Sequence, residues 1–293
     1  MEKFALLTAI KNSGGAEQPD AEVDALLAKL EFLEKTNRYG RLLTSITSSN
    51  DKNNFLAAIF EITFAFQFES AGFALDYEVK QADADGSSID FLLRMPSGKS
   101  VFFEARLLQQ DASTTKSIKE QLEDSSFYQV AMNGQDEHDA IVRLQNVILS
   151  KVQKPDGTPT KFLYVAANVV NIVVVDVSDL ILGTIDVHDC LLATHGDPAV
   201  AGVYRRGIFG LFQDPDPRYP AQIQKIAQSF EHIRNTLSGV LFSFKSSKAS
   251  ALDYNLQQYM MWNSRLVDDG LAKDLLLEIS RALPTRGSRG NGQ

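Results

Sequence analysis

Hydrophobic positions in the first quarter of the chain recur at helical spacing. In residues 20–35 the apolar positions fall on one face of a helix, and they are Val23, Leu26, Leu27, Leu30 and Leu33. Residues 54–72 are apolar almost all round and end at Gly72, which is typical of a helix buried on more than one side. The pattern predicts an N-terminal helical extension over residues 1–50, followed by a buried helix.

Strand-like segments follow this helix. Residues 73–79, 88–95 and 100–108 are rich in aromatic and branched side chains, and the turn sequence Pro-Ser-Gly-Lys separates the last two. A helical stripe covers residues 136–154, and residues 171–179 begin as a near-continuous apolar run, as expected of a strand covered on both faces. The order helix, three strands, helix, strand predicts an α/β fold with a mixed central sheet flanked by helices.

The rest of the chain divides less sharply. Residues 51–182 contain the predicted core, and residues 183–283 read as a C-terminal α/β extension packed on that core. Within this extension, residues 183–222 are rich in Gly, Pro and Asp and predict a long irregular region. The polar residues 284–293 predict a disordered tail.

Composition narrows the function classes. The single cysteine, Cys190, excludes an intramolecular disulfide and a Cys-rich zinc site, and a reducing, cytoplasmic environment fits best. We see no signal peptide and no apolar stretch long enough to span a membrane. The net charge of −8 argues against a non-specific nucleic-acid coat, but it leaves room for an enzyme with a local basic groove.

Two acids interrupt the apolar hairpin of residues 88–108. Because side chains alternate along a strand, Glu104 and Arg106 share one face. Asp90 lies directly opposite Glu104 if the pairing is centred on Ser97, whereas a two-residue Ser97-Gly98 turn would put the acids on opposite faces. The sequence leaves this register open.

Two neighbouring carboxylates repel each other unless a cation lies between them. Oxygen ligands without His or Cys nearby suit Mg²⁺, Mn²⁺ or Ca²⁺. The simpler alternative is that Asp90 or Glu104 faces solvent, or pairs with Arg94 or Arg106.

Three polar residues on the predicted helices are further candidates. Glu61 stands within the apolar helix of residues 54–72, where it needs a partner unless it lies at a solvated edge. Gln145 lies on the apolar stripe of residues 136–154, and Lys151 lies at its edge. The alternative is that Gln145 only satisfies buried backbone groups and that Lys151 extends to water.

The acids, in this order, resemble the PD-(D/E)XK superfamily of restriction-endonuclease-like nucleases. The matching pieces are Glu61 in AAIFEITFAF, Asp90 in SSIDFLL, and Glu104 with Arg106 in VFFEAR. The resemblance covers under half of the chain. It implies a restriction-endonuclease-like core and a metal-dependent nuclease that hydrolyses phosphodiester bonds, with Mg²⁺ or Mn²⁺ held by Asp90 and Glu104 and completed by Glu61.

The resemblance also implies roles for the remaining candidates. Arg106 would stabilise the transition state, and Gln145 would orient the attacking water or a phosphate. Arg106 departs from the family's usual lysine, and arginine cannot give up a proton as lysine can. Lys151 is the nearest replacement; otherwise the chain is a catalytically inactive nucleic-acid- or protein-binding module.

The expected partner is DNA, with RNA as the alternative, and no membrane. A homodimer is one of the assemblies left open, and defence, repair or mobile-element biology would suit such an enzyme. A Cys–His nucleophile formed by Cys190 with His188 or His195 is a much weaker reading, because no motif supports it.

Overall fold

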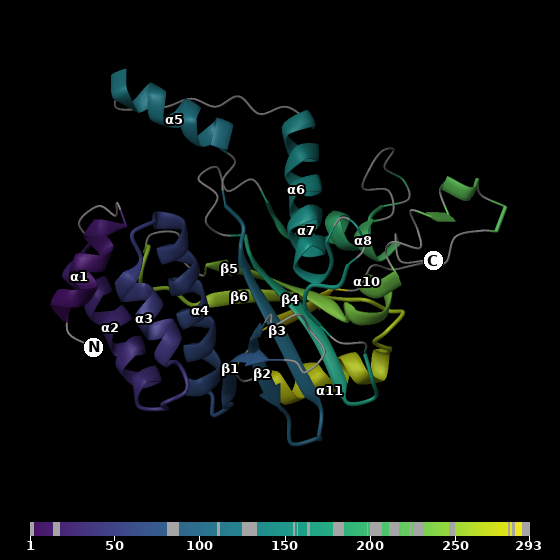
Figure 1. The fold of residues 1–293 in the computed structure, drawn as a ribbon, viewed down its shortest axis with the longest axis horizontal. Coiled ribbons are helices and arrows are strands. Elements are labelled where there is room, and N and C mark those ends of the chain that lie inside the picture. The colour runs from purple at the N-terminus through teal and green to yellow at the C-terminus, as the bar shows by residue number, and fades with distance from the viewer. Residues whose placement is uncertain are drawn as a thin grey trace.

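A seven-stranded mixed sheet forms the centre of the protein, and its strands lie side by side in chain order. The computed structural model describes residues 3–13, 18–80, 88–109, 112–124, 134–154, 158–162, 165–177, 185–197, 207–210, 231–245, 250–280 and 285–288, with a few shorter stretches between them. Helices lie against both faces of the sheet (Figure 1). The predicted α/β class with a mixed sheet flanked by helices is therefore confirmed.

The sheet combines an antiparallel meander with parallel crossovers. Its strands are β1 (Leu75–Lys80), β2 (Ser88–Arg94), β3 (Ser100–Leu107), β4 (Val169–Asp176), β5 (Gly239–Lys245), β6 (Leu256–Trp262) and β7 (Thr285–Ser288). Strands β1 to β3 are antiparallel, β3 to β5 are parallel, β6 is antiparallel to β5, and β7 is parallel to β6.

One face of the sheet is covered by the N-terminal helices and by the helix between β6 and β7. These are α1 (Lys3–Asn12), α2 (Asp20–Glu34), α3 (Gly40–Ser48), α4 (Lys52–Ser70) and α11 (Asp269–Ile279). Helix α4 begins where the Asp51 side chain accepts a hydrogen bond from the Asn54 N–H. Phe64 of α4 then packs on Phe91 and Phe103 of the sheet, with ring centroids 5.3 and 5.4 Å away.

The opposite face is covered by helices from the two parallel crossovers. These are α6 (Gly134–Val152), α7 (Val187–Thr194), α8 (Gly207–Gly210) and α10 (Glu231–Thr236). Helix α5 (Ala112–Asp124) lies farther out, at the top of Figure 1. In the described part of the chain, none of the helices is both long and apolar enough to cross a membrane.

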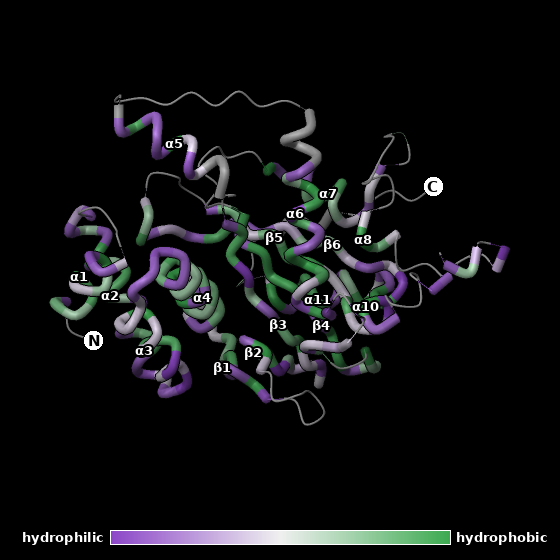
Figure 2. Tube along the Cα trace, turned by 45° about the horizontal axis from the view of Figure 1, so that its top comes forward, coloured by the Kyte–Doolittle hydropathy of each residue, from purple (hydrophilic) through white to green (hydrophobic). Residues whose placement is uncertain are grey.

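The sequence of β3 separates two hydrophobic cores. Phe103 and Ala105 belong to the core under α4, whereas Phe102 packs against the core under α6. Glu104 lies on the same face as Phe102 by strand alternation, so it points toward α6. The hydropathy colouring in Figure 2 shows mostly apolar strands in the middle of the sheet, which makes a carboxylate there conspicuous.

Three expectations about the C-terminal part need correction. The predicted irregular region of residues 183–222 contains helices α7 and α8. The predicted extension of residues 183–283 does more than pack on the core, because its strands β5 and β6 continue the central sheet. Residues 285–288 form β7 within the expected tail, since they pair with the exposed edge of β6; residues 289–293 lie outside the described part.

Candidate active site

The turn between β2 and β3 decides which acids meet. Met95 N–H donates to the Lys99 carbonyl at 2.8 Å, and Gly98 N–H donates to the Met95 carbonyl at 2.9 Å. The loop therefore has three residues, 96–98, and Gly98 adopts a φ of 82°, which glycine tolerates without strain. An odd-length loop centred on Ser97 is the condition under which Asp90 lies opposite Glu104.

Asp90 is skipped by the ladders on both of its sides. Pairing of β2 with β1 passes from Phe91 to Ile89, and pairing of β2 with β3 ends at Phe91. Glu78, the residue opposite in β1, has a φ of 50°, which is rare and strained for a residue other than glycine. The Asp90 carboxylate instead accepts a hydrogen bond from the Ala105 N–H at 2.7 Å. The sheet is thus locally opened where Asp90 stands.

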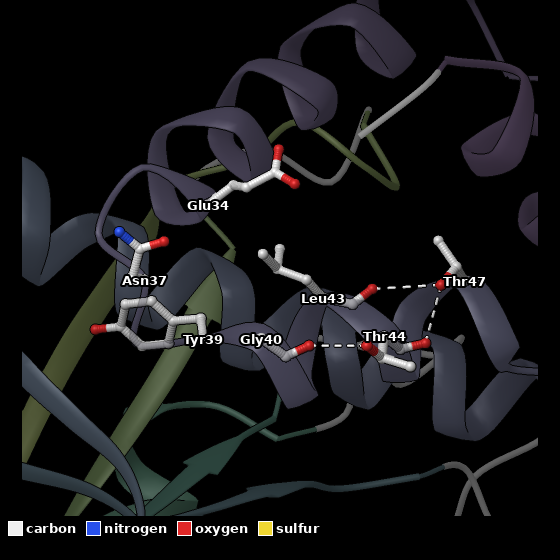
Figure 3. Close-up of a pocket in the computed structure, with 7 residues that line it drawn as sticks. All are labelled: Glu34, Asn37, Tyr39, Gly40, Leu43, Thr44 and Thr47. Carbon is white, nitrogen blue, oxygen red and sulfur yellow. Dashed lines mark hydrogen bonds between the residues drawn. The ribbon is translucent and has the colours of Figure 1, made fainter.

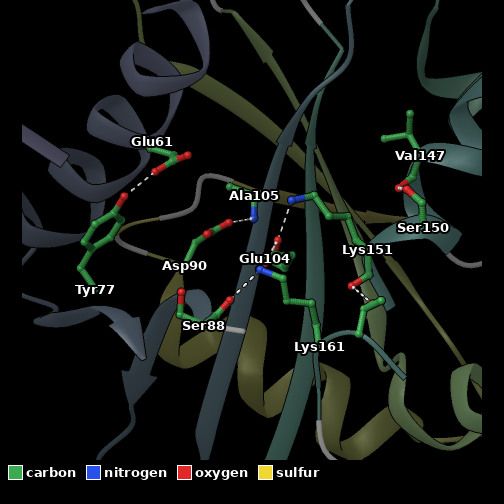
Figure 4. Close-up of polar contacts among 11 residues, drawn as sticks. Glu61, Tyr77, Ser88, Asp90, Glu104, Ala105, Val147, Ser150, Lys151 and Lys161 are labelled. Carbon is green, nitrogen blue, oxygen red and sulfur yellow. Dashed lines mark hydrogen bonds and ion pairs between the residues drawn. The ribbon is translucent and has the colours of Figure 1, made fainter. Parts of the chain in front are cut away.

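Glu104 is fully buried and faces two lysines. Its Oε1 lies 2.6 Å from Lys151 Nζ and 3.1 Å from Lys161 Nζ (Figure 4). Lys161 Nζ also donates to the Ser88 carbonyl at 2.6 Å. The other oxygen, Oε2, is buried and has no hydrogen-bond partner among the described residues. The two ammonium groups compensate the buried negative charge, but they contact only Oε1 and leave Oε2 without a hydrogen bond.

Glu61 approaches from the other side of Asp90. It is half-buried on α4, and its Oε2 accepts a hydrogen bond from the Tyr77 hydroxyl at 2.9 Å (Figure 4). Burial and the charge of Glu61 together raise the pKa of Tyr77, so the phenol remains a donor. The sequence-predicted need of Glu61 for a partner is met by a tyrosine that sequence reasoning had missed.

The electrostatics tie Glu61 and Asp90 to their neighbours. Burial, with a smaller contribution from the charge of Asp90, raises the pKa of Glu61 to about 8, while the Tyr77 hydrogen bond opposes the shift. Burial and then the charge of Glu104 raise the pKa of Asp90 to about 7, against the opposing charge of Lys151. Glu61 and Asp90 thus resist ionisation because they are buried and because another carboxylate is near, and a cation between the acids would relieve the repulsion.

A common pattern links the three carboxylates. Each has one oxygen held by the protein: Glu61 by Tyr77, Asp90 by the Ala105 N–H, and Glu104 by the lysines. The second oxygen of each makes no hydrogen bond with any described residue. Carboxylates fixed at one oxygen and open at the other are suited to bind a further ligand.

As the side chains stand, the three acids do not form a ready cage. No group of three or more His, Cys, Asp or Glu side chains in the described part of the chain is arranged to hold a metal ion. The residues still fit Mg²⁺ or Mn²⁺, because Mg²⁺ is commonly held by one or two carboxylates together with water and substrate oxygens. Asp90 and Glu104 supply two such carboxylates, and the buried, unpartnered Glu104 Oε2 is the atom that a cation would satisfy.

The remaining predicted residues have different outcomes. Lys151 reaches Glu104, although Arg106 occupies the motif position. Arg106 is exposed and makes no hydrogen bond or ion pair with a described residue. Gln145 is buried and donates to the Ala193 carbonyl at 3.1 Å, so it joins α6 to α7. This contact agrees with the simpler alternative, in which Gln145 satisfies a buried backbone group.

Lys161 is the second residue that the sequence reasoning missed. It lies between α6 and β4, outside the helical stripe and outside the acid-x-basic motif. The one signal that could have pointed to it is its position directly before Phe162, a buried residue that begins the apolar run FLYV.

The weak Cys–His reading is not supported by the geometry. Cys190 is fully buried, and burial together with the nearby Asp189 raises the pKa of its thiol, which suppresses the reactive thiolate. The ring of His195 instead contacts the Trp262 carbonyl at 3.2 Å and the Thr194 hydroxyl at 3.1 Å. His195 is thus a packed residue.

An open cavity of about 430 Å³ lies beside α3 and is lined by none of these acids (Figure 3). Its threonine hydroxyls are engaged by their own helix: Thr44 donates to the Gly40 carbonyl, and Thr47 donates to the Thr44 carbonyl. Tyr39, at the edge of the cavity, donates to Glu69. The cavity brings together no group comparable with the acids and lysines around β3.

Comparison with known proteins gives no relative from which a function could be transferred. No protein-family model, no curated protein and no solved structure matches the chain. The candidate site therefore stands on its geometry alone.

Proposed function

We propose that the protein is a metal-dependent nuclease with a restriction-endonuclease-like core, hydrolysing phosphodiester bonds in DNA. One observation carries this proposal. Three carboxylates lie near enough to interact electrostatically where the sheet opens, each with one fixed and one free oxygen, and a lysine lies against the most buried of them.

The order of elements supports the proposal. Helix α4, strands β1 to β3, helix α6 and strand β4 follow one another as helix, three strands, helix, strand, the order of that superfamily's core. Glu61, Asp90 and Glu104 stand on the helix and the two strands where the superfamily carries its acids.

The residues have separable roles in this proposal. Asp90 and Glu104 would hold the metal through their free oxygens, and Glu61 would reach it directly or through water. A bound Mg²⁺ supplies an activated water and neutralises charge on the phosphate. The Ala105 N–H keeps Asp90 from rotating away, and Tyr77 does the same for Glu61.

Lys151 takes the place of the motif lysine. Its ammonium can position the attacking water or contact a phosphate oxygen, and it reaches the site from α6 instead of β3. Arg106 is exposed on the same face of β3, two residues beyond Glu104, where it can contact a neighbouring backbone phosphate.

The test is cleavage of plasmid, linear and single-stranded DNA, and of RNA, with Mg²⁺ or Mn²⁺. We expect Glu104→Gln to abolish cleavage and Glu31→Gln, an exposed glutamate on α2, to leave it unchanged. Absence of any cleavage that depends on both the metal and Glu104 would contradict the proposal.

A catalytically inactive binding module is the second candidate. It is favoured by the lack of a ready three-residue metal cage in the described part of the chain and by the exposed Arg106. Calorimetry separates the two: nucleic-acid binding without any heat of Mn²⁺ binding supports the module, whereas Mn²⁺ binding that Asp90→Asn removes supports the enzyme.

A further inference from the structure

The two lysines around Glu104 have more hydrogen-bonding capacity than the protein uses. An ammonium group has three N–H donors. Among the described residues, Lys151 Nζ donates one hydrogen bond to Glu104, and Lys161 Nζ donates one to the Ser88 carbonyl and forms an ion pair with Glu104. Both positive charges also act on the neighbouring Asp90 carboxylate. The pair therefore has spare N–H donors beside the two carboxylates proposed to hold the metal.

These lysines are held by a compact backbone unit. The Thr160 hydroxyl donates to the Lys151 carbonyl at 3.2 Å, and the Thr160 N–H donates to the Val152 carbonyl at 3.1 Å. Lys154 N–H donates to the Thr158 carbonyl at 2.9 Å. The end of α6 is thus fastened to the segment that carries Lys161, so the two ammonium groups are positioned in advance and are not loose surface lysines.

The pair is also within reach of solvent. Each lysine side chain is 21% exposed, whereas the Glu104 side chain is not exposed at all. An incoming anion can therefore approach the lysine side chains from solvent.

We propose that Lys161 and Lys151 together bind a phosphate of the nucleic-acid backbone, with Lys161 as a substrate-binding residue outside the acid-x-basic motif. This inference rests on the proposed nuclease function, since it assigns the substrate contact of the same site. One phosphate oxygen would take the free donors of both ammonium groups, which hold the backbone beside Asp90 and Glu104.

The experiment measures DNA binding without catalysis. A fluorescent duplex oligonucleotide is titrated with full-length protein in EDTA, and binding is followed by anisotropy across a range of salt concentrations. Lys161→Ala is expected to weaken binding about tenfold. The slope of the logarithm of the binding constant against the logarithm of the salt concentration should become shallower by about one released counterion. Lys161→Arg should restore much of the affinity, since it keeps the charge.

Lys154→Ala is the matched control. Lys154 is exposed in the same segment and carries the same charge, so its loss should change binding far less. Equal effects of Lys161→Ala and Lys154→Ala, with both variants folded by circular dichroism, would overturn the inference. A loss of binding in Lys161→Ala that Lys161→Arg does not restore, together with a lowered melting temperature, would overturn it too.

The outcomes separate this inference from the nuclease proposal. Metal-dependent cleavage with unchanged DNA binding in Lys161→Ala would reject the lysine pair and keep the enzyme. Lys161-dependent DNA binding without cleavage would reject the enzyme and keep the pair. Thermal stabilisation by inorganic phosphate that requires Lys161, without oligonucleotide binding, would show a free-phosphate site and overturn the backbone assignment.

Discussion

Two buried glutamates in this protein are treated in opposite ways. Glu69, at the end of α4, is 7% exposed and has both oxygens engaged. One oxygen pairs with Arg38, and the other accepts from the Tyr39 hydroxyl at 2.6 Å and from the Leu75 N–H at 2.9 Å. Glu104, in the middle of β3, has both lysines on one oxygen and none of the described donors on the other.

The difference distinguishes a structural carboxylate from one kept for a ligand. Burying a charge is costly unless its lone pairs are satisfied. Glu69 meets this requirement and fastens the turn before α3 to the start of β1. Glu104 does not, and its neighbours Asp90 and Glu61 are in the same half-satisfied state. Several carboxylates with an unpartnered oxygen in one place indicate a functional site, where these oxygens are available to bind a ligand.

The largest expected contrast is in activity. Glu104→Gln should lower metal-dependent cleavage at least about 1,000-fold, because a metal ligand contributes several kcal/mol to the transition state. Glu69→Gln should keep near-normal turnover per folded molecule, measured after correcting for the folded fraction. Similar losses in both variants would remove the distinction between the two glutamates.

Stability does not separate the two glutamates in this way. Glu69→Gln should lower the free energy of unfolding by about 3 kcal/mol, because it leaves the Arg38 charge without its partner. Glu104→Gln should lower it by a similar amount, because Lys151 and Lys161 then lose the carboxylate with which they pair. Urea denaturation without metal measures both, and an unchanged stability of Glu104→Gln would show that these ion pairs do not stabilise the fold.

The dependence of stability on pH sharpens the comparison further. The pKa of Glu61 is raised from 4.5 to about 8, so between these values the folded protein holds a proton that the unfolded chain has lost. Stability from this group is present at low pH and is lost as pH rises toward 8. In EDTA, the free energy of unfolding of Glu61→Gln should increase relative to that of the wild type by up to about 1.4 kcal/mol for each pH unit in this window. Parallel stability profiles would contradict the raised pKa.

The smallest expected effect concerns Tyr77. Its hydroxyl stabilises the charged form of Glu61, so Tyr77→Phe should raise the pKa of Glu61 further. The change should correspond to about 1 kcal/mol, the usual contribution of one hydrogen bond. Carboxyl NMR titration measures it, and Tyr259→Phe, whose hydroxyl accepts from Gln257 on β6, provides the control. An unchanged titration would show that Tyr77 does not orient Glu61.

Local pattern was sufficient for much of the fold. The apolar run before Gly72, the alternating strands around the Pro-Ser-Gly-Lys turn and the stripe of residues 136–154 predicted α4, β2, β3 and α6, because backbone periodicity fixes which side chains can be buried. The failures lie at residues 183–222 and 285–288, where short elements form through contacts with distant parts of the chain.

The sequence by itself determined which acids are available and on which elements they stand: Glu61 on a buried helix, and Asp90 and Glu104 on two joined strands. It also proposed Lys151 as a substitute for the motif lysine. The tertiary structure decided the three-residue loop that sets Asp90 opposite Glu104. It also decided that the ladders skip Asp90 and that Lys161 reaches Glu104. The register follows from the turn geometry, which the sequence Pro-Ser-Gly-Lys leaves open between two loop lengths. The reach of Lys161 depends on contacts between segments far apart in the chain, and no local pattern encodes those distances.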